Sequence, residues 1–429
     1  MKKIVASVGL VALGASVIQI ASAQAQSADN SKPWNVSATL RGFYDDNFST
    51  LADSFNPPNF DKETTGFEIS PSASVGWDFE NTKLSLAYTY SYKYYDEKPY
   101  GSTEHADQSH TFTALLNHAF SERFRLSLRD SFVVGQEPDL LRAGNTFSTF
   151  QRVSGDNIRN YGNLTVNADV TRQFGIEAGY ENSYYNYSDD GAGSLSAVLD
   201  RIEQAPHIDA RYKFTPKTTG VAGYQFGLTD YTADEPLSDS GLPNEPLSDY
   251  RNSRAHYLYL GADHNFTPDM VGMIRAGARF TDYYNDENAG NDTSPYVKAS
   301  LRYLYAPESF VEGGFTYDLT STDVVGSYAA NVGDVTTGAD TASVFGSVTH
   351  RITPKIFGNL LGQIQHSTYN NGLFDGEADL FYLVGVNVEY RFNRHFLANI
   401  GYNYDKLDSD VPDRGFDRNR VYIGVTASY

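Results

Sequence analysis

The chain has 429 residues, with 33 lysines and arginines against 53 aspartates and glutamates, and it contains no cysteine. The lack of cysteine excludes disulfide frameworks, zinc ribbons, thiol nucleophiles and iron–sulfur clusters, and a net charge of −20 argues against binding to nucleic acid. Aromatic residues make up 14% of the chain, which is more apolar area than disordered chains carry. The composition therefore indicates a large, glycine-rich, all-β protein.

The first 25 residues have the features of a secretory signal peptide. Two lysines precede an apolar stretch from Ile4 to Ile20, and small residues after it offer two overlapping A-x-A cleavage sites. A membrane anchor is the alternative, but the stretch is short for a spanning helix. We expect residues 1–25 to be removed, residues 26–33 to form a short lead and residues 34–429 to form one folded domain. No later stretch predicts a spanning helix, which leaves a soluble protein or a membrane β-barrel.

Alternation of apolar and polar residues predicts strands and decides between these two classes. From Lys83 to Tyr94, one face carries leucines and tyrosines, and the other carries mostly small polar residues. The segment from Phe67 to Phe79 repeats this pattern. The two facing sheets of a soluble sandwich would meet through bulkier, less polar residues, whereas strands that line a wet lumen carry a small polar face. The pattern favours a membrane barrel.

About 18 such segments follow one another, each near the roughly 9–11 residues that a tilted strand needs to cross a bilayer. An even number suits a closed antiparallel barrel of the bacterial type. The predicted strands start at Trp34, Thr65, Lys83, His110, Phe124, Asn157, Phe174, Arg201, Thr218, Ser253, Met270, Thr293, Ser309, Thr341, Ile356, Leu380, Phe396 and Asn419.

The connections between these segments alternate in length. The short ones include four turns with a bulky residue, then Thr or Ala, then Pro, as in Phe214-Thr215-Pro216. Proline at the second turn position fixes φ where the chain reverses. The long ones are polar, such as Gln136–Asp156 and Ala233–Asn252. Because short turns lie in the periplasm and long loops outside, eight turns and nine loops predict a chain that starts and ends in the periplasm.

Both ends of the predicted barrel resemble known bacterial proteins. The last strand is an alternating apolar run that ends in Tyr429, and it resembles the signal by which the barrel-assembly machinery recognises outer-membrane barrels. The first strand runs from Trp34 into the element Tyr44-Asp45-Asp46-Asn47. This Y-D-x-N element and the F-T-P turns resemble the putative β-barrel porin 2 family.

The resemblance implies a fold and a function. Family members resemble 18-stranded outer-membrane proteins, and several are associated with the export of capsule or exopolysaccharide. For this chain the resemblance implies a porin-like pore in the bacterial outer membrane, with a glycan as substrate and periplasmic export proteins as partners.

The alternation also assigns charged side chains to the lumen of the barrel. Opposed bases and acids across a pore would create a transverse field and a constriction for polar solutes. The alternative is that these charges pair across adjacent strands and keep the wall hydrated. The predicted pore-lining residues are Arg125, Arg129, Arg275, Arg279, Lys298, Arg302, Glu312 and Asp318.

The excess of acidic residues falls mainly in the loops, one of which repeats Glu235–Asp239 as Glu245–Asp249. Clustered carboxylates would hold Ca²⁺ or Mg²⁺ and bridge to lipopolysaccharide, but no calcium-binding spacing occurs, and solvated acidic loops are the simpler interpretation. Tyrosines near the strand ends indicate an aromatic girdle. Sugar stacking on inward-pointing rings, such as Tyr95 and Tyr185, is the alternative.

No motif of a hydrolase, a phosphate-binding loop, a zinc protease or a dinucleotide-binding fold occurs in the mature chain. We therefore predict no enzyme activity, no catalytic residue, no cofactor and no metal site. The predicted partners are membrane lipid, lipopolysaccharide, the assembly machinery and a polar solute. Two functions remain open: a channel for polar solutes, or a non-conducting structural or adhesive barrel that acts through its acidic loops.

Overall fold

The computed structural model describes residues 32–52, 54, 61–97, 104–136, 156–239, 245–286, 290–325 and 335–429. The predicted signal peptide lies outside the described residues. The strands are β1 (Trp34–Asp45), β2 (Thr64–Asp78), β3 (Thr82–Tyr95), β4 (Ala106–Ala119), β5 (Phe124–Gly135), β6 (Asn157–Asp169), β7 (Phe174–Tyr187), β8 (Arg201–Thr215), β9 (Thr218–Tyr231), β10 (Ser253–Thr267), β11 (Met270–Asp282), β12 (Asn291–Ala306), β13 (Ser309–Thr320), β14 (Gly338–Arg351), β15 (Ile356–Asn370), β16 (Ala378–Arg391), β17 (Phe396–Ser409) and β18 (Phe416–Ser428).

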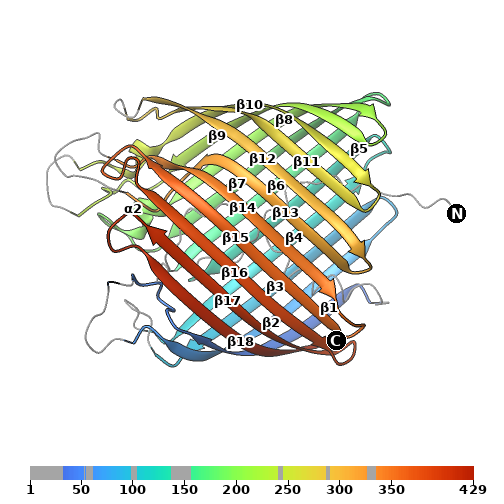
Figure 1. The fold of residues 1–429 in the computed structure, drawn as a ribbon, viewed down its shortest axis with the longest axis horizontal. Coiled ribbons are helices and arrows are strands. Elements are labelled where there is room, and N and C mark those ends of the chain that lie inside the picture. Colours follow the sequence, from blue (N-terminus) through green and yellow to red (C-terminus); the bar gives the residue numbers. More distant parts are fainter. Residues whose placement is uncertain are drawn as a thin grey trace.

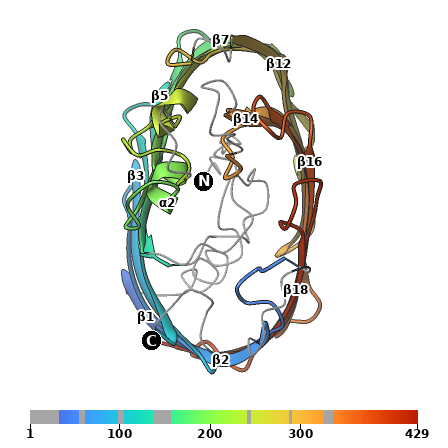
Figure 2. The same ribbon diagram turned by 90° about the vertical axis from the view of Figure 1, so that its left-hand side faces the viewer.

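These strands form one closed antiparallel sheet. Each strand pairs with the next along the chain, and β18 pairs with β1. At this seam, Ser37 lies opposite Ser428, and the backbones of Val36 and Tyr429 exchange hydrogen bonds of 3.3 and 2.9 Å. The strands are tilted (Figure 1), and the ring that they form is oval in cross-section (Figure 2). The predicted 18-stranded antiparallel barrel is confirmed.

The connections alternate as predicted. Every connection at one end of the barrel has at most four residues, whereas those at the other end have between six and 21 residues; in Figure 1 the short turns lie on the right and the long loops on the left. In the turn Thr353-Pro354-Lys355, the threonine hydroxyl accepts hydrogen bonds from the amides of Lys355 and Ile356, at 3.2 and 3.0 Å. Threonine before proline therefore caps the reversal that proline begins.

The outer surface of the barrel is apolar. On β10, Leu258 and Leu260 are 56% and 69% exposed, whereas the intervening Tyr259 is 8% exposed. A large exposed apolar surface on a closed barrel is the surface that faces lipid. No helix among the described residues is long and apolar enough to cross a membrane.

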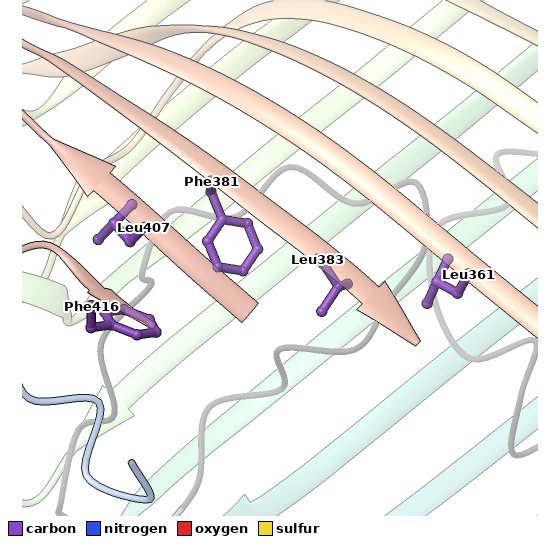
Figure 3. Packing of buried hydrophobic residues seen from close by; sticks show 5 residues of the cluster. All are labelled: Leu361, Phe381, Leu383, Leu407 and Phe416. Atoms are coloured by element: carbon purple, nitrogen blue, oxygen red, sulfur yellow. The ribbon is translucent and has the colours of Figure 1, made fainter. Parts of the chain in front are cut away.

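One part of the inner wall departs from the predicted small polar face. Leu361, Phe381, Leu383, Leu407 and Phe416 are at most 2% exposed and form one cluster on β15 to β18 (Figure 3). Phe381 and Leu383 alternate with Tyr382 and Val384, and Val384 is 41% exposed on the lipid-facing side. The prediction of a polar inner face is wrong for this part of the wall.

Candidate functional site

The inner wall of β5 to β11 carries a ladder of ion pairs. Asp169 binds both Arg125 and Lys213, with N–O distances of 3.2 and 3.0 Å. Asp263 binds both Arg211 and Arg275, each at 2.8 Å, and Arg211 also binds Glu177 at 2.7 Å. These side chains are between 11% and 46% exposed, so the ladder is a hydrated polar wall.

The predicted bases and acids of β11 to β13 meet across neighbouring parts of the sheet. Arg279 donates to Asp318 at 3.3 Å and also to the carbonyl of Leu319. Arg302 lies 3.8 Å from Glu312, the residue opposite it in the register of β12 and β13. These contacts favour the alternative interpretation, in which the charges pair along the wall.

Two of the predicted pore-lining bases have no ion pair within the described parts of the chain. Arg129 lies on β5 opposite Asn163, and Lys298 lies on β12 opposite Thr316. Both side chains lie on the inner face of their strands, because the residues before them, Leu128 and Val297, belong to the apolar outer face. They are therefore the bases on the predicted list that form no direct ion pair there. That these eight residues line a pore stays a prediction.

The extracellular mouth is narrowed by two short helices. Helix α2 (Leu195–Leu199) follows β7, and the 3₁₀ helix η2 (Ser248–Arg251) precedes β10. Figure 2 shows α2 inside the ring, beside the wall. Ser194 caps α2 by accepting a 3.1 Å hydrogen bond from the amide of Ala197. The hydroxyl of Ser248 donates to the carbonyl of Ala197 at 2.6 Å, so the two helices are joined.

The repeated sequence explains how η2 is placed. The two copies, Glu235–Asp239 and Glu245–Asp249, pair with each other in antiparallel fashion through a bridge between Pro236 and Leu247. The amide of Leu237 donates to the carbonyl of Pro246 at 2.9 Å. The repeat therefore folds the loop back on itself and brings the following arginine, Arg251, into the mouth.

A segment after β13, which we call the lumenal strap (Ser321, Thr322, Asp323 and Val324), is held by partners from distant strands. The guanidinium of Arg251 donates to the carbonyls of Thr322 and Val198, the latter at 2.9 Å. The hydroxyl of Ser321 donates to Glu203 of β8 at 2.9 Å. Since β8 and β13 are five strands apart in the ring, the strap crosses part of the lumen.

The other side of the lumenal strap is bound by Arg414, in the loop between β17 and β18. Arg414 contacts Asp323 at 2.6 Å and Asp379 at 2.9 Å, and both carboxylates are at most 10% exposed. Two arginines from opposite directions therefore hold one segment. Sequence spacing gave no signal for this arrangement, because the partners are 91 residues apart in one case and 71 in the other.

Arg251 is buried in the mouth, and within the described structure none of its contacts is an ion pair. It is 1% exposed, and its guanidinium lies 4.3 Å from the ring centre of Tyr231. Burial lowers the pKa of its guanidinium. Burial also disfavours the charged form of Asp200 at the end of α2 and raises the pKa of its carboxyl, although Ser196 and the amide of Tyr187 donate hydrogen bonds to it.

A polar cavity of about 270 Å³ lies between the lumenal strap and the inner wall. Strands β7 to β11 supply one side of it, and the end of β13 with Ser321 supplies the other. Its lining includes Glu181, Tyr185, Gln225, Thr229, Arg279 and Asp318. Amides, hydroxyls and paired charges suit polar solutes that exchange their water for hydrogen bonds with the wall.

The predicted sugar-stacking tyrosines are covered by protein side chains. Tyr95 is fully buried, with its ring 5.7 Å from Phe48 and 5.6 Å from Phe43. The ring of Tyr185 is covered by the guanidinium of Arg201 at 4.1 Å. Tyr95 is therefore not accessible to a sugar, and the prediction of sugar stacking on this residue is wrong. Within the described ranges, no group of three or more His, Asp or Glu side chains is arranged to hold a metal ion.

The carboxyl-terminal part of the chain matches a known family. Residues 333–429 match the family model described as Putative beta-barrel porin 2. The predicted resemblance is confirmed over this stretch. It contains β14 to β18, at the opposite end of the chain from the Y-D-x-N element. No curated protein matches the chain.

Solved structures of bacterial porins are similar to the chain. The outer membrane protein opdK from Pseudomonas aeruginosa is 12% identical, covers 92% of this chain and 99% of its own, and has a TM-score of 0.43. OccAB4 from Acinetobacter baumannii is 13% identical, and the match covers 93% of this chain and 99% of OccAB4, with a TM-score of 0.44. A BenF-like porin from Pseudomonas fluorescens Pf-5 is 12% identical, and the match covers 92% of this chain and 99% of that porin, with a TM-score of 0.45. Since identities and TM-scores are low, the barrel is assigned from the strand order of this chain itself.

The chain is a porin-like β-barrel of the bacterial outer membrane. The closed wall, the apolar outer surface and the match to a porin family carry this conclusion, and the predicted localisation is confirmed. A porin family is also consistent with the lack of enzyme motifs in the sequence.

Proposed function

We propose that this barrel is a channel for polar solutes, with its narrowest part at the extracellular mouth. The observation that carries the proposal is the lumenal strap, which Ser321 and Arg414 tie to opposite parts of the wall. A barrel of 18 strands is wide enough to conduct unless segments fill its lumen. The strap narrows the mouth, and the ion-pair ladder below it supports passage of hydrated solutes.

The finer proposal is that the solute is a glycan, as the family resemblance implies. The support from the site is the chemistry of the cavity beside the strap, whose lining includes Gln225, Thr229 and Arg279. Soluble neutral and acidic oligosaccharides added to a conducting channel test this directly. Block by a glycan supports the proposal, whereas currents that no glycan changes would favour small solutes instead.

Arg129 and Lys298 allow a test of which face of the strands lines the lumen. We expect the double variant Arg129→Glu and Lys298→Glu to shift the ion preference towards cations, with the permeability ratio changing by about twofold or more, because both residues are on the inner face of the wall and neither forms an ion pair within the described residues. The measurement is the reversal potential in a salt gradient. Lys355→Glu, in an exposed turn outside the lumen, is the matched control.

An unchanged reversal potential in the double variant would refute the assignment of these two residues to the lumen. Reversing Arg279 or Arg302 is a weaker test, because each already contacts a carboxylate and its reversal would place two acids side by side. The rival function, a non-conducting platform, predicts no current from any of these proteins when they are folded.

A further inference from the structure

The inner wall of β1 to β4 carries a large group of hydroxyls. Two rows of side chains that lie opposite one another on these four strands consist entirely of serine and threonine. They belong to the inner face, because the intervening Leu40, Ile69 and Phe112 are 52%, 43% and 47% exposed on the outer face. We call the two rows the hydroxyl wall: Thr39, Ser70, Ser91 and Ser109 in one row, and Ser37, Ser72, Thr89 and Thr111 in the other.

The hydroxyl wall spans most of the membrane. Ser37 lies three residues along β1 from Trp34, and Ser91 lies nine residues along β3 from Thr82; both strands start at the periplasmic end. At about 3.3 Å per residue and a strand tilt of about 40°, these positions are ~8 and ~23 Å above the periplasmic end of an apolar band that is about 25 Å tall. A solute that crosses beside β1 to β4 therefore meets hydroxyls along most of its way.

The hydroxyl wall is open to the lumen, whereas the wall on the other side of the barrel is covered. All eight side chains of the hydroxyl wall are half-buried. Across the oval ring (Figure 2), Gln363, Leu383 and Asp405 lie opposite one another on the inner face of β15 to β17, and they are at most 2% exposed. At this level, the water-accessible space of the lumen therefore lies on the side of β1 to β4.

Much of the hydrogen-bonding capacity of the hydroxyl wall is free. Thr89 donates to Ser72 at 3.0 Å, but the hydroxyls of Ser37, Ser109 and Thr111 have no hydrogen-bond partner among the described residues. Each hydroxyl is both a donor and an acceptor, so it can bond to water or to a sugar hydroxyl in either direction. Many weak sites in succession allow a solute both to enter and to leave, as conduction requires.

The charges that border the hydroxyl wall balance one another. On its extracellular side, the next row across β1 to β4 alternates in sign: Arg41, Glu68, Lys93 and Asp107. Below this row, the inner face of these strands carries no charged residue until the periplasmic ends of β2 and β3. An acidic solute would find no guanidinium or ammonium along the wall to offset the hydration that it gives up.

We propose that solutes cross the barrel along the hydroxyl wall, and that this wall favours uncharged, hydroxyl-rich solutes such as neutral saccharides over acidic ones. The inference rests on the proposed channel function. It adds the side of the lumen that the solute follows and the charge class of the solute.

Cysteine accessibility tests the path, because the chain has no native cysteine. Ser72→Cys lies in the hydroxyl wall, and its matched control is Ser343→Cys, on the inner face of β14 where the serine is 3% exposed. We expect a bulky, uncharged, water-soluble maleimide to label Ser72→Cys about tenfold faster, because it reaches only accessible thiols. Labelling should lower the single-channel conductance of Ser72→Cys about twofold and leave that of Ser343→Cys unchanged.

These results separate a wrong path from a wrong function. Equal labelling rates, or a current that labelling of Ser72→Cys does not change, would overturn the path while the channel stands. Folded protein that labels at Ser72→Cys but never conducts would refute the channel, and the path with it. Heat-modifiable gel mobility shows that each variant is folded.

Protection from labelling tests the preference for uncharged solutes. We expect maltohexaose to slow the labelling of Ser72→Cys about threefold, and an oligogalacturonate of the same length to leave the rate nearly unchanged. Adding Thr89→Val and Thr111→Val removes two hydroxyls at constant shape and should abolish the protection. Thr165→Val, on the inner face of β6 where the threonine is 2% exposed, is the control and should preserve it. Equal protection by both sugars, or protection that survives the double change, would overturn the preference.

Discussion

Replacing Arg251 by alanine is expected to raise the single-channel conductance roughly twofold, because the constriction at the mouth loses one of its two arginine anchors. Arg251 donates to the carbonyls of Thr322 and Val198, which lie in the lumenal strap and in α2. Hydrogen bonds from a charged donor contribute about 1.5–3 kcal/mol each. Their loss should free the strap from α2 while the strands of the wall stay paired.

The matched control for this variant is Arg254→Ala. Arg254 is three residues further along and is exposed on the outer parity of β10, where its guanidinium lies 4.3 Å from the ring centre of Tyr284. It should leave the conductance unchanged. If Arg251→Ala and the unaltered protein have the same single-channel conductance, the strap does not limit the current.

The largest expected effect on stability concerns the seam between β1 and β18. Arg418 contacts the carboxylate of Asp45, with its Nε atom at 2.9 and 3.1 Å from the two oxygens, and both side chains are at most 3% exposed. Arg418→Met leaves this carboxylate buried without the guanidinium. Breaking a buried pair on one side costs about 3–5 kcal/mol, so we expect a loss of that size in the free energy of unfolding.

Equilibrium unfolding in urea from lipid vesicles measures this loss. Lys406→Met is the control, because Lys406 and Asp408 form an ion pair of 2.8 Å whose side chains are 39% and 50% exposed. Exposed pairs contribute about 0–1 kcal/mol. A loss below about 1 kcal/mol for Arg418→Met would mean that the seam does not depend on this pair.

Strand starts next to the short turns could be predicted from the sequence almost to the residue. Phe124, Phe174 and Met270 are predicted and observed starts of β5, β7 and β11. At the extracellular end β6, β8 and β10 also begin where predicted, but other strands reach further: β4 begins at Ala106 rather than His110, and β18 at Phe416 rather than Asn419. Above the membrane both faces of a strand meet water or loops, so the alternation that reveals the strand disappears.

The apolar cluster of the inner wall and the lumenal strap could not be predicted in the same way. The run Leu380–Val386 is apolar at nearly every position, which is typical of a strand with apolar residues on both faces. The strap depends on contacts between loops far apart in the chain, such as Arg414 with Asp323. The alternation of apolar and polar residues shows which side chains share a face of a strand, but it carries no information about which loops fold inward.

The central claim is that the barrel conducts through a narrowed mouth, and single-channel recording of the folded protein in a planar bilayer tests it most directly. We predict stepwise currents whose size increases when Arg251 is replaced by alanine. Folding is established beforehand by heat-modifiable gel mobility. Persistent silence from folded protein, with and without the Arg251→Ala change, would contradict the channel and favour the non-conducting barrel.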